Sequence, residues 1–479
     1  MTIPTAYTDL FRVGNATVDL APGTYNIIVD YGAGFISSPV TTQVTIESEK
    51  SVETSVTVNV VFKPQELGWY TVDLHHHSDY LDGKTPPNLL VVSQLASALD
   101  FIFVSDHDYV DNCPLIREYA EARGKPFICG VEISPDWAHF NVYPVIHPEK
   151  LIYRGTLREI ITAARSAGAI VVRANHPYIG GLFIAQEMNN IPGGYYEDWD
   201  TAEINGPWGS DDYRTLSKMF MLWDLGFRKY LTAGSDVHDV ITQTYTGKPR
   251  VVAYLPNGPD PIALAYAEKY GRTFITYGPF IFTDPLPGSI VLAGSLDHNI
   301  SVKVKYFAVN GLDRIEVYVK TGRLYRSIPL DRAISGEVEI QIPVSVITNN
   351  TLNGYVVLVA FDVAGNRAIN NPIWIDLAGV PVTDTITMTT TETITQITTT
   401  SITYTYSYAE TTTVPTTYTE ITTSIATITE KTTVSITQTE TTTRMYTSVV
   451  ETTRYDTAIA LAIVAFIIGA GLGIVIKRR

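Results

Sequence analysis

The stretch WYTVDLHHHSDYLDG, residues 69–83, decides how the rest of this chain is interpreted. Its first half alternates apolar and polar residues like a buried strand, and it ends in three histidines followed by Asp82. Residues two apart on a strand share a face, so His75 and His77 should point together while His76 points away. A histidine pair at a strand end near an acid is typical of a metal site. The alternative is a polar loop whose histidines bind nothing.

The distribution of histidines favours the metal site, because eight of the nine lie between His75 and His238. From about residue 67 to 283, strand-like runs alternate with amphipathic helices such as PLIREYAEARG and TLREIITAARSAG. Repeated β-then-α units predict a parallel sheet or a barrel. In a β/α barrel the active site lies at the carboxyl ends of the strands.

Polar residues follow four further predicted strands in this region. The motifs are VSDHD, GVEISPDWAHF, ANHP and GSDVHD, and they contribute Asp106, His107, Glu132, His139, His176, Asp236 and His238. Histidines and carboxylates without thiolates suit Zn²⁺, Mn²⁺ or Fe²⁺. Each motif alone is a weak signal, but five of them on consecutive strand ends strongly indicate a metal centre.

The order of these motifs resembles the PHP (polymerase and histidinol phosphatase) metallohydrolases, and within them the CehA/McbA-type branch. The resemblance covers about residues 67–283 and includes EINGP and GRTFITYGP. It implies a distorted (β/α)7 barrel with two to three divalent metals. It implies three ligand sets: His75, His77, Glu132 and Asp236 for one metal; Asp82, His107 and His238 for a second; and Glu132 bridging to a third held by His139 and His176. Asp79 is the alternative to Asp82.

Adjacent divalent ions lower the pKa of a bridging water, and the resulting hydroxide can attack a phosphoester. We therefore expect a metal-dependent hydrolase, with a small-molecule phosphoester as the favoured substrate. A carbamate or ester hydrolase with the same metals, and a non-enzymatic surface structural or adhesive protein, are the alternatives. The predicted catalytic residues are Asp236 and His238 at the metals and Arg173 and Arg250 as anion-binding groups, with Lys248 a further candidate. Solvated loop charges are the alternative for the cations, and Glu203 either supports a ligand or is a satisfied strand-end acid.

The flanking segments predict a multidomain chain. Residues 1–66 alternate like a β-rich domain, which is possibly incomplete, and residues 284–378 resemble an immunoglobulin-like β-sandwich. Residues 379–455 form a Thr/Ser-rich stalk. Residues 456–479 contain a run of twenty uncharged residues followed by Lys-Arg-Arg, which predicts a transmembrane helix with a basic cytoplasmic tail.

Composition and topology signals place the expected enzyme outside the cell on a single-pass C-terminal anchor. The net charge of −15 argues against a nucleic-acid backbone as the main partner. Sequons occur at Asn15, Asn299 and Asn349. No export signal is seen at the start, so either the true start lies upstream or the anchor inserts after synthesis. The apolar run around Cys129 predicts a buried residue. A disulfide between Cys113 and Cys129 is possible but is not determined by the sequence, and the oligomeric state is also left open.

Overall fold

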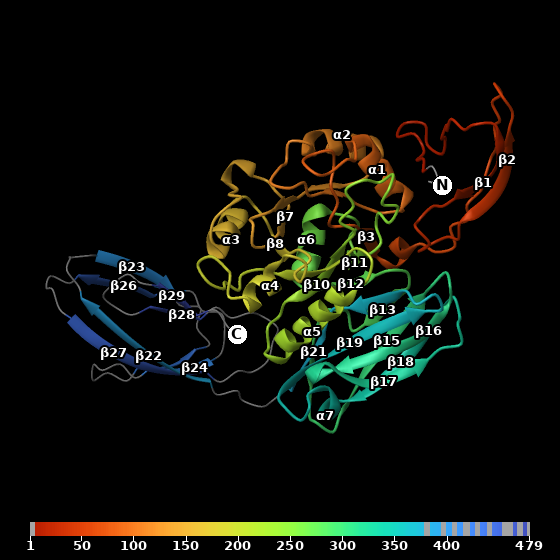
Figure 1. The fold of residues 1–479 in the computed structure, drawn as a ribbon. Helices are drawn as coiled ribbons and strands as arrows, with labels where there is room; N and C mark the ends of the chain where they lie inside the picture. Colours follow the sequence, from red (N-terminus) through yellow and green to blue (C-terminus); the bar gives the residue numbers. More distant parts are fainter. Residues whose placement is uncertain are drawn as a thin grey trace. The chain divides into compact units, whose positions relative to one another are not determined.

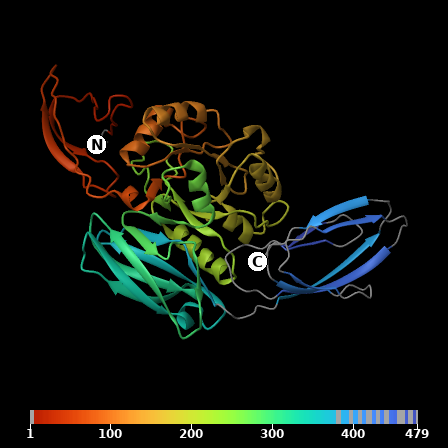
Figure 2. The same cartoon turned by 180° about the vertical axis from the view of Figure 1, so that it is seen from behind.

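The structure, a computed structural model, describes residues 5–377 and, beyond them, the backbone of eight short strands between residues 384 and 476. The chain divides into two compact units, Met1–Asp376 and Leu377–Arg479. Of residues 5–377 we call residues 67–283 the α/β region and residues 284–377 the C-terminal β region. Figures 1 and 2 show helices α1, α2 and α3 on the outside of the α/β region, around its strands.

The elements of the first unit follow the chain in this order. The helices are η1 (Pro64–Leu67), α1 (Pro87–Ala96), α2 (Cys113–Ala122), η2 (Pro148–Lys150), α3 (Leu157–Ser166), α4 (Leu182–Glu187), α5 (Ser210–Asp224), α6 (Pro261–Lys269), η3 (Lys320–Gly322) and α7 (Val344–Ile347). The strands before residue 284 are β1 (Gly23–Val29), β2 (Val40–Ile46), β3 (Trp69–Val72), β4 (Ile102–Val104), β5 (Phe127–Cys129), β6 (Val131–Ile133), β7 (Phe140–Tyr143), β8 (Val171–Ala174), β9 (Thr201–Asn205), β10 (Tyr230–Gly234), β11 (Arg250–Tyr254), β12 (Thr273–Thr276) and β13 (Phe280–Asp284). The C-terminal β region adds β14 (Ile290–Ala293), β15 (Asn299–Phe307), β16 (Leu312–Val319), β17 (Arg323–Pro329), β18 (Ser335–Pro343), β19 (Asn353–Asp362), β20 (Arg367–Asn370) and β21 (Ile373–Leu377).

Backbone hydrogen bonds bring the strand ends of the α/β region to one edge. β4 and β5 pair in parallel, and β6 to β10 form one sheet in sequence order. A bridge between His76 and Val237 joins the segment after β3 to the one after β10, and a bridge between His107 and Glu132 joins the segment after β4 to β6. β7 departs from the predicted parallel order, because it pairs antiparallel with both β6 and β8. The connection 134–139 is too short for a helical crossover, so β7 must run backwards. The (β/α)7 barrel stays a prediction.

Burial explains why the central strands are almost entirely apolar. Strands β8 and β10 are buried at every position, as expected for strands covered on both faces. Helix α3 begins at Thr156 with a capping box, in which Thr156 and Glu159 satisfy each other's backbone N–H groups. The apolar face of α3 then packs into the main core of the α/β region.

The C-terminal β region is continuous with the α/β region through one sheet. β12 pairs with β20, so the sheet runs in the order β14-β21-β19-β20-β12-β11-β3, while β13, β15 and β18 form a second sheet. The buried Asn371 accepts a hydrogen bond from the backbone N–H of Leu231 and donates to Thr273. The predicted boundary at residue 283 falls within β13. The domain limits and the immunoglobulin-like topology stay predictions.

The N-terminal segment contains less sheet than its alternation predicts. β1 and β2 form a two-stranded antiparallel hairpin, and residues 51–62 belong to no strand in the described structure. This part of the predicted β-rich domain 1–66 therefore forms no strand, although its residues alternate, because strand formation depends on tertiary context as well as on the local pattern. Phe62 at the end of this segment instead stacks on Phe307, with ring centroids 4.2 Å apart.

For the second unit only backbone strands are described. They are β22 (Asp384–Thr393), β23 (Thr399–Tyr404), β24 (Glu410–Val414), β25 (Thr422–Ala426), β26 (Thr432–Thr437), β27 (Thr443–Thr452), β28 (Ile463–Phe466) and β29 (Gly473–Ile476). The other residues of the predicted stalk and membrane segment lie outside the described residues, and both stay predictions. In the part of the chain that is described, no helix is long and apolar enough to cross a membrane.

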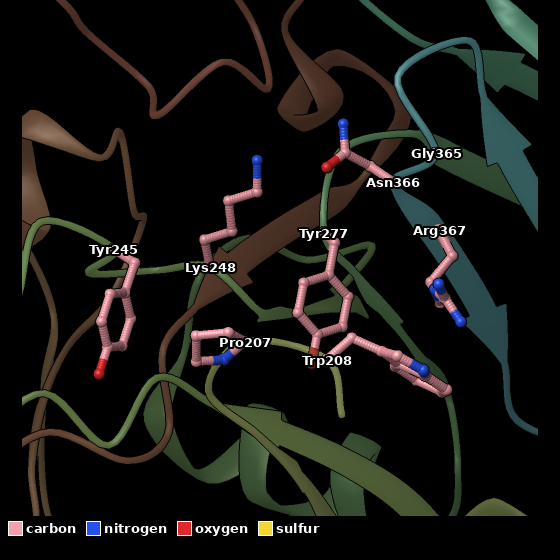
Figure 3. Close-up of a pocket in the computed structure, with 8 residues that line it drawn as sticks. All are labelled: Pro207, Trp208, Tyr245, Lys248, Tyr277, Gly365, Asn366 and Arg367. Atoms are coloured by element: carbon pink, nitrogen blue, oxygen red, sulfur yellow. The ribbon is translucent and has the colours of Figure 1, made fainter. Parts of the chain in front are cut away.

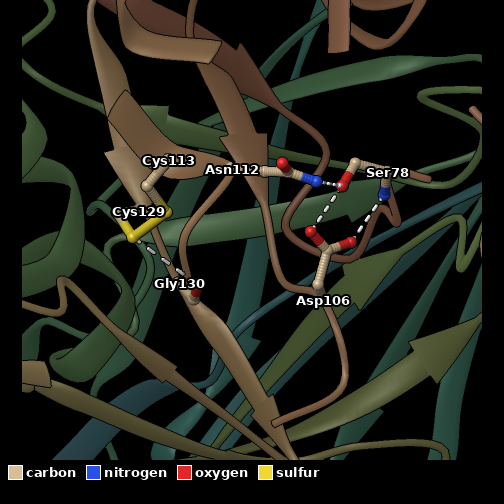
Figure 4. Close-up of a disulfide and its surroundings, with 6 residues drawn as sticks. All are labelled: Ser78, Asp106, Asn112, Cys113, Cys129 and Gly130. Atoms are coloured by element: carbon tan, nitrogen blue, oxygen red, sulfur yellow. Dashed lines mark hydrogen bonds between the residues drawn. A yellow bond between two sulfur atoms is a disulfide. The ribbon is translucent and has the colours of Figure 1, made fainter. Parts of the chain in front are cut away.

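A disulfide joins Cys113, at the start of α2, to Cys129, at the end of β5 (Figure 4). The bond therefore ties a helix to the strand pair that precedes Glu132. The sequence had left this pairing open. Cys129 is buried, as its apolar surroundings predict, but it is half of a covalent link rather than a free thiol.

We predict that replacing the buried Glu268 will stabilise the protein at alkaline pH. Burial raises the pKa of Glu268 to about 7, although its bond from Tyr143 and the charge of Arg173 act to lower it. Because the folded pKa exceeds the ordinary value, the stabilising contribution is present below pH ~4.5 and is lost as the pH rises through about 7. Glu268→Gln should therefore raise the free energy of unfolding at pH ~8.5 by up to about 3 kcal/mol and change it little at pH ~5. Urea unfolding at both pH values measures this, and equal effects at the two would contradict it.

Candidate metal centre

The edge where the strands end gathers the predicted ligands. His75 and His77 follow β3, His107 follows β4, His176 follows β8, and Asp236 follows β10. Glu132 lies within β6, and His139 immediately precedes β7. Because β7 runs antiparallel, its beginning lies at the same edge as the ends of its neighbours. The reversed strand thus brings His139 into the same cluster.

The carboxylate of Glu132 lies at the centre of this cluster and is fully buried. Five histidines place a ring nitrogen within 3.3 Å of it. They are His75, His77 and His107 at Oε2, and His139 and His176 at Oε1. The two oxygens of one carboxylate therefore face two different groups of imidazoles, which is the arrangement of a bridging ligand.

Four histidines of the cluster donate their Nδ1–H to an oxygen atom. The pairs are His75 with Glu203 (2.9 Å), His107 with Ser134 Oγ (2.6 Å), His176 with the carbonyl of Ile179 (2.8 Å) and His238 with the carbonyl of Asp236 (2.9 Å). A neutral imidazole has a single N–H, so Nε2 of each ring keeps its lone pair for the cluster. Metal-ligating histidines are oriented in this way, by a partner that holds the other ring nitrogen.

The donor set fits divalent cations. Nε2 of His75 lies 3.1 Å from Glu132 Oε2 and 3.2 Å from Asp236 Oδ1. A lone pair that faces two carboxylate oxygens repels them unless a proton or a cation lies between. All donors are nitrogen or oxygen, since both cysteines are in the disulfide. Such a set suits Zn²⁺, Mn²⁺ or Fe²⁺ and leaves the identity open.

The raised pKa values of His75 and His77 also indicate that the cluster favours positive charge. Burial acts to lower the pKa of His75, but the charges of Asp236, Glu203 and Glu132 outweigh it and hold the pKa well above the usual value. Burial likewise opposes the shift at His77, whose pKa the bonds and charges of Asp236 and Glu132 raise to about 9. The site therefore attracts protons where divalent ions would bind.

Ligand atoms converge in three groups, each within 4.8 Å. The groups are His75, His77, Glu132 and Asp236; His77, His107 and His238; and His107, Glu132 and His139. The first equals the first predicted set. The second has His77 where Asp82 was predicted, and the third has His107 where His176 was predicted. Together they fit a multi-metal site.

Asp82 lies at the rim of the cluster. Its side chain is 62% exposed, and its oxygens lie 3.7 Å from His107 Nε2 and 3.4 Å from His238 Nε2. Asp79, the alternative, instead accepts a hydrogen bond from Asn112. The structure therefore brings Asp82, rather than Asp79, to the two histidines of the second predicted set.

The predicted anion-binding arginines are both buried and hydrogen-bonded elsewhere. Arg173 donates to Glu203 at 2.7 Å and to Asn175, so it supports the acid that orients His75. Arg250 donates to the carbonyl of Gly247, and its guanidinium lies 3.6 Å from the ring centroid of Phe35. One guanidinium nitrogen of each, Nη1 of Arg173 and Nη2 of Arg250, is buried and has no hydrogen-bond partner within the described residues. Contact of either arginine with a substrate anion stays a prediction.

The strand parity appears as predicted. His75 and His77 face the cluster, while His76 lies 3.3 Å from Thr246 Oγ1, fully buried on the other side. Burial and the neighbouring His77 lower the pKa of His76 to about 3, so it is neutral. His76 belongs to the support of the cluster rather than to its ligand atoms.

Two buried aspartates fix the loops that carry the ligands. Asp73 accepts hydrogen bonds from the backbone N–H and the hydroxyl of Ser235, the residue before Asp236. Asp106 accepts the same pair from Ser78, at the other end of the cluster (Figure 4). Each aspartate thus positions a neighbouring ligand rather than a metal.

Two amides were missed as functional residues. Asn175 donates to Glu132 Oε1 at 2.8 Å, and Asn205 donates to Asp236 Oδ2 at 3.1 Å, which leaves Asp236 Oδ1 for the histidines. Their position beside the motifs ANHP and EINGP was the available signal. Asp236 also adopts a φ of +56°, and such strained backbone is common at functional sites.

We predict that Glu203 controls metal affinity through His75. Glu203→Gln removes the charge that strengthens the Nδ1–H bond while keeping an acceptor, so the affinity for Mn²⁺ should fall about 10-fold to 100-fold. Calorimetric titration of the metal-free protein measures this, with Glu149→Gln, an exposed acid paired with His147, as the control. An unchanged affinity in Glu203→Gln would refute the positioning role.

A known enzyme is similar in sequence to this chain. No family model matches the sequence. The chain is 26% identical over 214 residues to a 3′,5′-nucleoside bisphosphate phosphatase of Chromobacterium violaceum, a match that covers 43% of this chain and 70% of that protein.

Two solved structures are also similar. A two-domain protein of Bacteroides vulgatus, described as containing a PHP-like metal-dependent phosphoesterase, aligns with a TM-score of 0.39 and 16% identity over 64% of this chain and 95% of its own. An amidohydrolase of Chromobacterium violaceum with bound sulfate aligns with a TM-score of 0.27 and 18% identity over 35% and 87%. The chain therefore has a relative named as a phosphatase and a structural neighbour named as a PHP-like phosphoesterase, while the CehA/McbA-type branch stays a prediction.

Proposed function

We propose that this protein is a metal-dependent phosphoesterase of the PHP type. The observation that carries the proposal is the buried Glu132 carboxylate, which faces the ring nitrogens of five histidines. The phosphatase named among its relatives supports the same reaction class. The ligands are His75, His77, Asp82, His107, Glu132, His139, His176, Asp236 and His238, holding two to three divalent ions.

Divalent ions bound there would neutralise phosphoryl oxygens and lower the pKa of water at the site. The residues of the chain prepare this centre. Glu203 and Ser134 hold the Nδ1–H groups of His75 and His107, which leaves Nε2 of His75 directed at Glu132 and Nε2 of His107 directed at Asp82. Asn205 occupies one oxygen of Asp236 and leaves the other for the cluster. No serine or cysteine nucleophile is required, and both cysteines are bonded to each other.

The cluster opens to solvent on the side of Asp82, the most exposed of the proposed ligands. His107 and His238, which face Asp82, are partly exposed, whereas His75 and His77 are fully buried. A phosphoester would approach from this side. His75 and His77 would then bind the ions from the buried side of the cluster.

We predict that His107→Ala and Asp236→Ala will each lower kcat/KM for phosphomonoesters by about 100-fold to 1000-fold, because each removes a ligand that positions the charge at the reacting group. The assay uses 4-nitrophenyl phosphate with Mn²⁺ or Zn²⁺. His147→Ala is the matched control, since His147 is exposed and lies outside the cluster. Full activity in Asp236→Ala would reject the proposed centre.

We also propose that the protein is membrane-anchored with its enzyme outside the cell. Disulfides form mainly in oxidising compartments, which agrees with the Cys113–Cys129 bond. The sequon asparagines Asn15, Asn299 and Asn349 are all exposed and accessible to modification. The uncharged segment 457–476 with its basic tail is the proposed anchor.

This topology predicts that protease added to intact cells will release the α/β region with its phosphoesterase activity. The expected cleavage lies between residues 379 and 455, and the released fragment is detected in the medium by immunoblotting. A cytoplasmic protein serves as the control for lysis. Cleavage only after the cells are broken would place the enzyme inside.

A further inference from the structure

A second feature lies beside the metal centre, where the α/β region meets the C-terminal β region. A cavity of about 300 Å³ is lined by Trp208, Tyr245, Lys248 and Tyr277 from the α/β region, and by Asn366 and Arg367 from the C-terminal β region. Figure 3 shows the aromatic rings and the two cationic side chains around one space. The cavity therefore combines flat apolar surfaces with positive charge.

The cavity adjoins the metal centre through shared loops. Asn205, which holds Asp236, is followed at once by Gly206, whose carbonyl accepts the hydroxyl of Tyr277 at 2.8 Å. Trp208 lies two residues further along the same loop. The charge of Asp236 also adds to the effect of burial in raising the pKa of Tyr245. The loop 205–208 therefore contributes to both features, with Asn205 at Asp236 and Trp208 at the cavity.

Among the residues that the structure describes, neither cation of the cavity forms an ion pair with a carboxylate. Lys248 is half-buried, and its backbone N–H donates to the carbonyl of Tyr245 at 2.9 Å, but its ammonium group makes no hydrogen bond or ion pair within the described residues. Arg367 donates to the neutral hydroxyl of Tyr213 and lies 4.1 Å from the ring centroid of Trp208. In a chain with a net charge of −15, two such cations in one cavity indicate a site for an anion.

Two carboxylates act on the charge of the Lys248 ammonium without forming an ion pair with it in the described structure. Burial lowers the pKa of the Lys248 ammonium. The charges of Asp362 and Asp30 act to raise this pKa, and the charge of Arg250 acts to lower it. Both oxygens of Asp362 already accept hydrogen bonds from Asn366, and one also accepts from Asn310. Asp362 thus holds the turn that presents Arg367.

The C-terminal β region is held rigidly at this cavity. The backbone N–H of Tyr277 donates to the carbonyl of Arg367 at 2.8 Å, and Thr276 pairs with Ala368 in the β12–β20 ladder. A Cβ atom on Gly278 would lie 2.9 Å from Cβ of Asn366, so the turn packs directly on the α/β region. The two walls of the cavity therefore keep a fixed spacing.

We propose that this cavity binds the non-reacting part of the substrate, and that this part carries a planar ring and a second anionic group. Lys248 and Arg367 pair with the anionic group, and the ring packs among Trp208, Tyr245 and Tyr277. The C-terminal β region is then part of the substrate site instead of a spacer. This inference rests on the proposed phosphoesterase function for the position of the reacting group.

The test compares phenyl phosphate with 4-carboxyphenyl phosphate, which differ only in a second anionic group, on the full-length enzyme. The variants are Lys248→Met and Arg367→Gln, and the control is Arg326→Gln, an exposed arginine on β17 of the same region. Wild type should prefer the carboxylated substrate. Each cavity variant should reduce kcat/KM for that substrate at least 10-fold while changing phenyl phosphate hydrolysis less than about 3-fold, and the control should change neither. Equal loss on both substrates, or no loss on either, would overturn the proposal.

A binding measurement separates this proposal from the reaction itself. The non-hydrolysable probe is 4-(phosphonomethyl)benzoate, titrated calorimetrically into wild type and the same variants. Weaker binding, by at least 10-fold in Lys248→Met and Arg367→Gln, supports the cavity even if wild type hydrolyses neither phosphate ester, in which case the proposed function alone fails. Equal binding to wild type and both cavity variants overturns the cavity proposal whatever the enzyme hydrolyses.

Discussion

The buried carboxylate of Glu132 is the constraint on which the rest of the structure depends. An ionised carboxylate without water is tolerated only when positive charge or donors surround it. Here Asn175 donates to one oxygen, and imidazole nitrogens from segments far apart in the sequence face both. The strand order and the reversal of β7 bring these nitrogens to one point. The hydrogen bonds of Asp73 to Ser235 and of Asp106 to Ser78 hold the loops that carry them. The same strand arrangement therefore determines both the fold of the α/β region and the position of the candidate metal ligands.

Much of this centre could be predicted from the sequence, because strand periodicity fixes direction. The alternation through residues 70–77 separates His75 and His77 from His76, and every ligand motif follows or opens a short apolar run. Periodicity does not predict which groups each side chain contacts. Arg173 and Arg250 stand next to ligand motifs in the sequence, yet each points into the protein, towards Glu203 and Phe35.

The same limit applies to the fold. The amphipathic helix α3 shows its polar stripe in the sequence, whereas α1, PNLLVVSQLA, is mostly apolar and gives little periodic signal. Residues 51–62 alternate like a strand but pair with no strand in the described structure, and pairing is a property of the whole sheet. The joining of β12 to β20 also lies beyond local pattern, because it depends on contacts nearly a hundred residues apart. That ladder nevertheless positions Arg367 at the cavity.

We propose that the Glu132 carboxylate bridges divalent ions. This proposal is tested most directly by crystals of the protein grown with Mn²⁺ and measured at a wavelength where manganese scatters anomalously. The account predicts at least two anomalous peaks, with one within about 2.3 Å of each Glu132 oxygen and with His75 and His77 Nε2 among the remaining ligands. An ordered Glu132 with no anomalous peak beside it, in crystals soaked in excess Mn²⁺, would contradict the account.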